Sequence, residues 1–263
     1  MPRDSDSFLT RDFPEALRKI RERTPARIFQ GRAGAAYRTG AQLELREAHA
    51  AARDAVKAEF ALGTAFEAEF VNHWSLFEVS TQARSKGEFL LRPDLGRRFS
   101  ADAKIEISKR CSPDCDLQIA IGDGLSVSAI SAQIPALLPL LFGAAGKRKW
   151  TMGQTFAIRY CRVGILNEIG ELLAPKVAVL LIGERPGLAT AESLSAYMAY
   201  QPCAAQTDTN RNLISNIHIR GVSSQAAADR ILNLAEQMIA EGMSGVGVKE
   251  RLDQPRKLPA FLE

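Results

Sequence analysis

Two charged residues, Glu184 and Arg185, are best placed for chemistry, because they follow six uninterrupted apolar residues, Val177 to Ile182. An apolar run of this length, ended by a glycine, is typical of a strand buried on both faces of a sheet. In an open α/β sheet, the loop after such a strand lies at its carboxyl end, where ligands bind. We therefore expect Glu184 or Arg185 to contact a ligand or a partner. The alternative is that the two pair with each other, or that one forms a buried salt link within the chain.

A second group of interest is the turn Gly122-Asp123-Gly124-Leu125-Ser126, which separates a strand-like segment from a helical pattern. Backbone amides at the start of a helix can bind phosphate or another anion. The turn lacks the third glycine of the dinucleotide-binding fingerprint. Two interpretations stay open: an anion- or nucleotide-binding site in a stand-alone α/β module, or an ordinary turn in which Asp123 satisfies the local backbone.

The cysteines and histidines form no legible metal site. Three residues separate Cys111 from Cys115, and no second Cys/His pair lies nearby in the sequence to complete a zinc site. The histidines, His49, His73 and His218, lie far apart. No Ser/His/Asp arrangement and no carboxylate pair on a shared face is visible. We therefore assign no metal ligand and no catalytic residue to this chain.

The first 110 residues are predicted to form a helical N-terminal domain. Helices are expected over 8–23, 41–60, 64–86 and 100–110, with turns between them. In the first of these helices Asp12 is a capping residue. Leu9, Phe13, Leu17 and Ile20 form an apolar stripe along it, which must be buried somewhere.

The pattern changes after residue 110, and residues 111–263 are predicted to form a Rossmann-like, mostly parallel α/β domain. Strands are expected over 117–121, 156–160, 177–182 and 214–219, and helices over 126–141, 191–200 and 224–240. Strands that alternate with helices favour a parallel sheet with helices on both faces. The whole chain is therefore predicted to be an α/β protein with a domain boundary near residue 111.

The composition argues against several classes of partner. The 263 residues are 46% hydrophobic and 24% charged, and 34 basic against 30 acidic residues leave a net charge of only +4. This charge is too mild and too dispersed to indicate nucleic acid. The apolar runs are too short for a membrane span, and the polar start lacks a secretory signal. We therefore expect a cytoplasmic protein with reduced thiols and without a nucleic-acid or membrane partner.

Blocks of sequence along most of the chain carry a family resemblance. The segment GERPGL at 183–188, followed by ESLSAY at 192–197, resembles the small (light) subunit of ethanolamine ammonia-lyase, the adenosylcobalamin-dependent enzyme. Further blocks occur in the family's order from Thr24 to His218: TPARI at 24–28, GRAG at 31–34, HAAARDAV at 49–56, RPDLGRR at 92–98, DLQI at 116–119, GDGLS at 122–126 and ISNIH at 214–218.

The resemblance implies a hetero-oligomer in which adenosylcobalamin lies between this chain and a large subunit that holds the substrate. The cofactor then initiates the radical conversion of ethanolamine to acetaldehyde and ammonia. By position in the family's motifs, Val163, Glu184 and Leu213 are the implied cofactor contacts. This chain would provide binding surface and no catalytic residue.

The chain departs from the family's pattern at two positions. Leu213 stands where the family has a cysteine, so an apolar or backbone contact carries over but thiol chemistry does not. Arg211 and Asn212 are alternative polar contacts beside it. Cys161 stands where the family has a glycine, two residues before Val163. The missing thiol at position 213 is the one feature that favours a further alternative, a cofactor-free scaffold with the same fold.

His218 lies in a segment, Asn216 to Gly221, that nearly fits the D-x-H-x-x-G motif of cobalamin proteins in which histidine replaces the lower axial base. Asn216 stands in place of the aspartate that would orient the imidazole. In the family that the chain resembles, the cofactor keeps its own dimethylbenzimidazole on cobalt. We therefore expect His218 to be a structural, hydrogen-bonded histidine, with cobalt ligation as the alternative.

Residues 1–23 precede the first family block at Thr24. In this family, short N-terminal extensions are associated with packaging into ethanolamine-using microcompartments. The resemblance thus implies a cytoplasmic location and allows residues 1–23 to be a targeting helix for a bacterial microcompartment. The alternative is that this helix folds back on its own helical domain.

Overall fold

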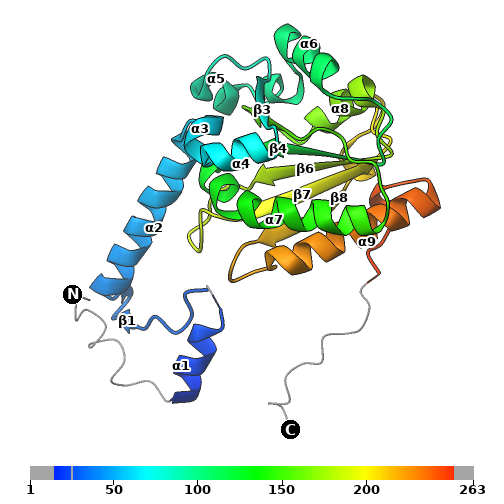
Figure 1. Ribbon diagram of the computed structural model, residues 1–263. Coiled ribbons are helices and arrows are strands. Elements are labelled where there is room, and N and C mark those ends of the chain that lie inside the picture. The colour runs from blue at the N-terminus through cyan, green and yellow to red at the C-terminus, as the bar shows by residue number, and fades with distance from the viewer. Residues whose placement is uncertain (1–14, 25, 252–263) are drawn as a thin grey trace.

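A six-stranded sheet organises the chain, as the computed structural model shows for residues 15–24 and 26–251 (Figure 1). The strands lie in the order β3-β5-β4-β6-β7-β8. They are β3 (Phe77–Ser80), β4 (Leu117–Gly122), β5 (Phe156–Arg159), β6 (Val177–Gly183), β7 (Leu194–Tyr200) and β8 (Asn212–Ile217). The first four run parallel, whereas β7 is antiparallel to both β6 and β8. The predicted α/β class with a mostly parallel sheet is confirmed.

Helices precede and connect these strands. The described N-terminal half contains α1 (Glu15–Glu22), α2 (Thr39–Lys57), α3 (Leu62–Ala65), α4 (Ala68–His73), α5 (Lys86–Leu91) and α6 (Ala101–Arg110), with a small β1 (Arg32–Ala33) and β2 (Ala36–Tyr37) hairpin. The second half contains α7 (Val127–Lys147), α8 (Ile165–Leu173) and α9 (Ser224–Glu241). Short 3-10 turns, η2 (Leu95–Arg97), η3 (Asp208–Asn210) and η4 (Gly245–Gly247), complete the described elements.

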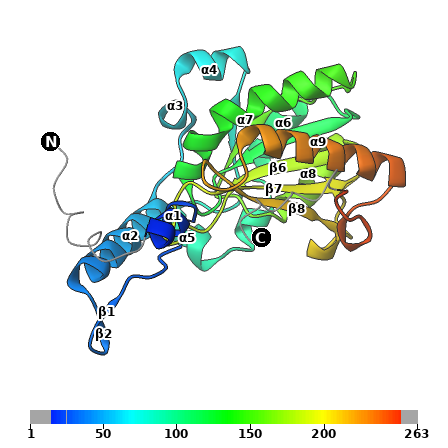
Figure 2. The same cartoon turned by 90° about the horizontal axis from the view of Figure 1, so that it is seen from below.

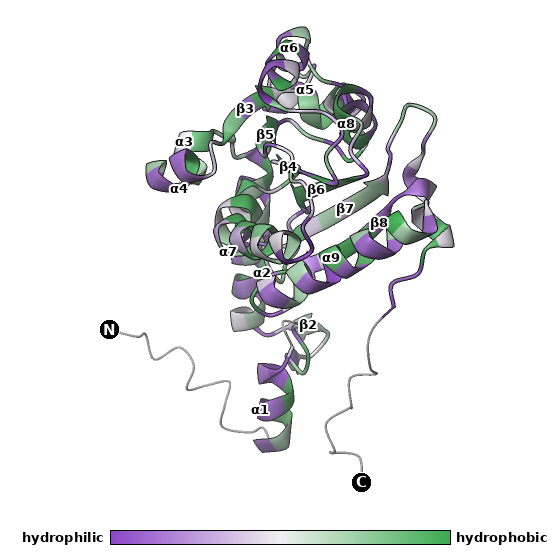
Figure 3. Cartoon of the chain, turned by 45° about the vertical axis from the view of Figure 1, so that its right-hand side comes forward, coloured by the Kyte–Doolittle hydropathy of each residue, from purple (hydrophilic) through white to green (hydrophobic). Residues whose placement is uncertain are grey.

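The helices cover the sheet unequally. α7 and α9 lie on one face, and α6 and α8 lie on the other (Figures 1 and 2). Because successive strand residues point to opposite faces, β6 gives Val179 and Leu181 to the core under α7 and α9, and Leu180 to the core under α6 and α8. β6 is therefore buried at every position. Figure 3 shows both hydrophobic and hydrophilic residues along α9, as a helix with one buried face requires.

Part of the α8-side face remains open over β7 and β8. Leu180, Tyr197 and Leu213 are register partners across β6, β7 and β8, so their side chains form one row on this face. Leu180 is fully buried, Tyr197 is partly buried, and Leu213 is 46% exposed. The solvent exposure of the side chains therefore increases along this row from β6 to β8. The row lies beside the carboxyl ends of β4, β5 and β6.

The expected helix over 191–200 is wrong, because this segment forms strand β7. Leu194, Ala196 and Met198 alternate with more polar residues and are buried in the core under α7 and α9. That spacing of two is the period of a strand. The segment pairs with β6 along seven residues, so the free edge of β6 determines its conformation.

The expectation of helix throughout 64–86 is also wrong. The segment contains α3, α4 and then β3, which pairs in parallel with β5 at one edge of the sheet. Phe77 and Val79 are buried and alternate with partly exposed residues. In the described part of the N-terminal half, the regular elements are thus helices apart from β3 and the small hairpin. The division into domains 1–110 and 111–263 stays a prediction.

The helix expected from Ser126 is confirmed and extends to Lys147 as α7, continuing through Pro135 and Pro139. It is long and apolar enough, by length and composition, to cross a membrane. Its buried residues, including Ile130, Ile134 and Leu138, pack in the core of the sheet. Its place in the core therefore accounts for part of the apolar composition of α7, since 39% of its apolar 18-residue window is buried.

The first predicted helix is described only in part. α1 spans Glu15–Glu22 and buries none of its residues. Asp12, Leu9 and Phe13, on which the expected cap and apolar stripe depend, lie outside the described residues. In Figure 1, α2 extends away from the sheet toward α1.

Candidate functional site

The three residues implied as cofactor contacts line one hollow. Val163 follows β5, Glu184 follows β6, and Leu213 lies on β8, yet all three border an open cavity of about 370 Å³. The cavity lies at the carboxyl ends of the parallel strands, where ligands bind in α/β sheets. Its other lining residues are Gly124, Leu125, Cys161, Arg162, Ile182, Gly183, Arg185, Ser195, Tyr197 and Ser215.

Glu184 is held in a fixed orientation by three hydrogen bonds. Its Oε2 accepts from Ser193 Oγ at 2.7 Å, and its Oε1 accepts from Ser195 Oγ and, at 3.0 Å, from the backbone N–H of Asn216. Within the described residues Glu184 forms no ion pair with Arg185. The half-buried carboxylate therefore belongs to a hydroxyl network on the open face, in contrast to the alternative of a Glu184–Arg185 pair.

The sequence analysis missed Ser193 and Ser195, whose hydroxyls donate to Glu184. Both reach Glu184 because they are two residues apart at the start of an extended strand, so their side chains point the same way. A helix over 191–200 would have placed them on different sides. The Ser-x-Ser spacing could have indicated two hydroxyls on one face. It has this meaning only in a strand, so it can be interpreted only once β7 is known to be one.

The loop that carries Val163 is held by hydrogen bonds to Asp123 and Gly96. Asp123 Oδ1 accepts the backbone N–H of Cys161 at 2.8 Å, and Gly96 O accepts the backbone N–H of Arg162 at 2.8 Å. Left-handed backbone falls on Tyr160, with φ at 58°, and Cys161 has no positive φ. The replacement of glycine by Cys161 therefore causes no strain in the backbone, and complete burial raises the pKa of its thiol.

Leu213 contributes an apolar side chain to the lining of the hollow, whereas Arg211 and Asn212 beside it bind other parts of the chain. Arg211, with only 4% of its side chain exposed, pairs with Asp208 and donates to Asn167 Oδ1 at 2.9 Å. The side chain of Asn212 binds backbone atoms of the segment 245–248. The alternative polar contacts, Arg211 and Asn212, thus have structural partners within the chain.

The turn 122–126 connects β4 to α7 and is closed against the β6–β7 loop. The N–H of Leu125 donates to Gly183 O at 3.1 Å, and the Ser126 hydroxyl donates to Ala191 O while it caps α7 by accepting from Ala129 N. Ser126 is fully buried. These groups are occupied by protein atoms, which favours the interpretation of an ordinary turn over an anion-binding helix start.

His218 is buried and hydrogen-bonded within its own segment. The N–H of Arg220 donates to Nδ1 at 3.3 Å, so Nε2 carries the proton and donates to Asn216 Oδ1 at 2.7 Å. Both ring nitrogens therefore have internal partners, and the structure agrees with a structural histidine. Among the described residues, no group of three or more His, Cys, Asp or Glu side chains could hold a metal ion, and all four cysteines are free thiols.

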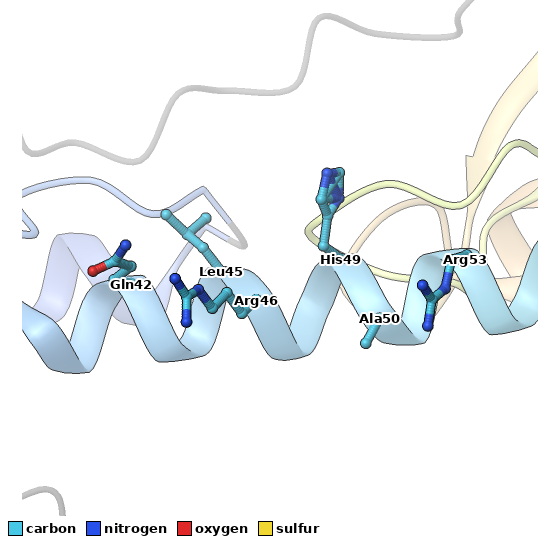
Figure 4. A pocket seen from close by; sticks show the side chains of 6 residues that line it. All are labelled: Gln42, Leu45, Arg46, His49, Ala50 and Arg53. Atoms are coloured by element: carbon cyan, nitrogen blue, oxygen red, sulfur yellow. The ribbon is translucent and has the colours of Figure 1, made fainter.

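A larger hollow of about 580 Å³ lies along α2 (Figure 4). Its lining side chains, among them Gln42, Arg46 and His49, all come from this one helix. A surface bordered by a single exposed helix lacks convergent groups from separate elements. The hollow around Glu184, which draws on three strand ends, is the better candidate for a binding site.

Comparison with known proteins identifies the family. A sequence model of the family described as ethanolamine ammonia-lyase light chain (EutC) matches residues 14–249. The chain belongs to this family. Family members are subunits of a lyase of ethanolamine degradation. The match begins at residue 14, so α1 lies within the region that the light-chain family shares, and only residues 1–13 precede it.

Individual relatives agree with the light-chain assignment. The ethanolamine ammonia-lyase small subunit of Clostridium perfringens is 38% identical over 235 residues, which cover 89% of this chain and 78% of the relative. That of Clostridium acetobutylicum is 37% identical over 235 residues, covering 89% and 95%. That of Clostridioides difficile is 36% identical over 248 residues, covering 94% and 80%.

Proposed function

We propose that this chain is the small subunit of an adenosylcobalamin-dependent ethanolamine ammonia-lyase, and that it clasps the cofactor against the large subunit. The observation that supports this most is the convergence of Val163, Glu184 and Leu213 on one hollow from three separate elements. Bound adenosylcobalamin would supply the adenosyl radical that converts ethanolamine to acetaldehyde and ammonia. The role of this chain is to bind, orient and shield the cofactor.

The chemistry of the hollow fits the edge of a corrinoid. Corrin side chains present amide N–H donors beside apolar methyl groups. A carboxylate offers about four acceptor positions, and Ser193, Ser195 and Asn216 use three of those on Glu184. One position on Oε2 is left for an amide N–H, while Val163 and Leu213 provide apolar contact.

Tyr197 adds a neutral polar group to the same wall. Burial, and then the nearby Glu184 carboxylate, raise the pKa of the Tyr197 phenol, so it stays protonated at neutral pH. The part of the hollow around Glu184 therefore combines one negative charge with hydroxyl and apolar groups, and Arg162 and Arg185 also line the hollow. Such a surface binds amide donors without a requirement for proton transfer.

The site needs a second wall, because Leu213 and Ser215 are exposed on the open part of the sheet. A hollow of about 370 Å³ can cover only part of a corrinoid. In the proposal the large subunit covers the remainder and contributes the catalytic residues. The chain alone is then inactive and binds cobalamin weakly, and the complex resides in the cytoplasm.

Reconstitution tests the proposal. The chain is co-expressed with the large subunit, and adenosylcobalamin binding is measured by the corrin absorption of the purified complex and of each subunit alone. We expect tight binding and release of acetaldehyde only from the complex. Acetaldehyde release by the single chain would contradict the division of labour. A complex that assembles but takes up no corrinoid would favour the cofactor-free scaffold.

A further inference from the structure

Three arginines near the proposed cofactor site have no acidic partner. Arg97, Arg162 and Arg185 form no ion pair with any carboxylate in the described part of the chain. Other cations nearby are paired: Arg211 with Asp208 and Lys86 with Asp123. The three arginines therefore lack a protein counter-ion in the described part of the chain, whereas Arg211 and Lys86 have one.

Arg162 is the most constrained of the three. Its guanidinium lies 4.3 Å from the centre of the Phe89 ring, and its Nε is buried without a hydrogen-bond partner. Burial first, then Arg185, and more weakly Arg97, lower the pKa of Arg162. Asp123, the acid whose charge acts on Arg162, is fully buried and already engaged by Lys86 and the backbone N–H of Cys161. A partly desolvated cation among like charges is unfavourable without a counter-ion.

The position of the pair Arg162 and Arg185 links it to the proposed site. Each directly adjoins a proposed cofactor contact, Val163 or Glu184. The same two arginines also line a neighbouring hollow of about 390 Å³, which faces α2 at His49 and Arg53. They thus stand between the corrin-facing cavity and a second, strongly cationic one.

We propose that Arg162 and Arg185 bind a phosphate group of the ligand, namely the phosphodiester in the nucleotide loop of cobalamin, with Arg97 adding positive potential. Guanidinium groups bind phosphate oxygens through paired, charge-assisted hydrogen bonds. Phosphate would supply the missing counter-charge. This inference rests on the proposed function, because it assigns one part of the same cofactor to these residues.

Three corrinoids that differ in the nucleotide loop test the assignment in the complex with the large subunit. Adenosylcobinamide lacks the phosphate, adenosylcobinamide phosphate carries it without the base, and adenosylcobalamin has the complete loop. Arg162→Gln and Arg185→Gln should each weaken binding of the two phosphate-bearing ligands by about ten- to a hundredfold. Their affinity for adenosylcobinamide should match that of the wild type. Arg148→Gln, at the far end of α7, is the control that removes a cation elsewhere.

The outcomes separate this inference from the proposal on which it rests. If the variants weaken all three ligands equally, or if the phosphate adds nothing to wild-type affinity, the phosphate assignment is overturned while the cofactor function stands. If the variants instead prevent assembly with the large subunit in the absence of corrinoid, the arginines serve an acidic partner surface, and the assignment also fails. If the wild-type complex takes up none of the three, both proposals fail.

Discussion

Ser195 donates its hydroxyl to Glu184 Oε1, so strand β7 orients the carboxylate that stands at the end of strand β6. The bond joins two neighbouring strands across the open end of the sheet. Because the N–H of Asn216 donates to the same oxygen, β8 contributes as well. A carboxylate held from two strands loses little conformational entropy when it binds a ligand.

This network predicts a graded series at the cofactor site. Glu184→Gln should weaken adenosylcobalamin binding by the complex by about 1–3 kcal/mol, since a charged acceptor is lost. Ser195→Ala should cost less, because it loosens the carboxylate without removing it. Titration of the complex, followed by corrin absorption, gives both affinities. Glu236→Gln, on α9 at the opposite face, is the control. Unchanged affinity in Glu184→Gln would remove Glu184 from the site.

The packing under the Val163 loop leads to a second prediction. A Cβ at Gly96 would lie 2.6 Å from Tyr160 O and 2.8 Å from Arg162 Cγ. Gly96→Ala should therefore lower the free energy of unfolding by about 1–3 kcal/mol, the usual cost of overpacking. Gly143→Ala, in α7 where a Cβ meets nothing within 4 Å, is the matched control and should be neutral or stabilising. Equal unfolding free energies in the two variants would show that the loop can move aside.

The buried strands could be predicted from the sequence, whereas β7 could not. β4 and β6 are apolar at nearly every position because both of their faces are covered, and this pattern is local. The residues of β7, rich in Ala, Leu, Met and Tyr, suit a helix almost as well as a strand. Their conformation depends on pairing with the free edge of β6, a tertiary contact that the local sequence does not show. β3 was not predicted for a similar reason. Only its pairing with β5 distinguishes the four residues of β3 from the helices that precede them.

The site likewise contains residues that the sequence pointed to and residues that it did not. The family resemblance pointed to Val163, Glu184 and Leu213, and the structure places them around one hollow, although their role in binding stays a prediction. Ser193 and Ser195 depended on the strand that was missed. Arg97 lies in η2, and its proximity to Gly164, in the loop after β5, follows from tertiary packing alone.

The contacts of Asp116 lead us to predict that the stability of the chain depends on pH. Its Oδ1 accepts from Lys176 Nζ at 2.7 Å and its Oδ2 from the N–H of Thr151 at 2.7 Å. The bond from Lys176, followed by that from Thr151, holds the pKa of Asp116 below its ordinary value of 3.8. Stabilisation from this group is complete above 3.8 and is lost as the pH falls through the lower folded-state pKa.

Asp116→Asn should therefore reduce the free energy of unfolding at neutral pH and make it depend less on pH below about 4. Urea denaturation across the acid range measures both effects. Asp229→Asn, on the exposed surface of α9, should keep the wild-type profile. Parallel profiles for wild type and Asp116→Asn would show that Asp116 has no linkage to folding.

His218 predicts a spectroscopic result. Because both of its ring nitrogens have partners within the segment 216–220, it should not replace the lower axial base of bound cobalamin. Electron paramagnetic resonance of the cob(II)alamin state, with nitrogen-15 histidine in this chain, should show no superhyperfine coupling to labelled nitrogen. His218→Ala should leave the spectrum unchanged while lowering thermal stability. A histidine-derived splitting would overturn the structural role.

The last prediction concerns residues 1–23, which we propose direct the complex to a microcompartment. α1 buries none of its residues, so its removal should cost this chain little packing. Deletion of residues 2–22 should therefore preserve assembly with the large subunit and lyase activity while abolishing association with shell proteins. Deletion of residues 2–13 provides the comparison, because it keeps α1 and removes only the part that precedes the family match. If the longer deletion prevents assembly or markedly lowers thermal stability, α1 belongs to the working fold of the light chain. If both deletions keep shell association, the segment is not a targeting signal.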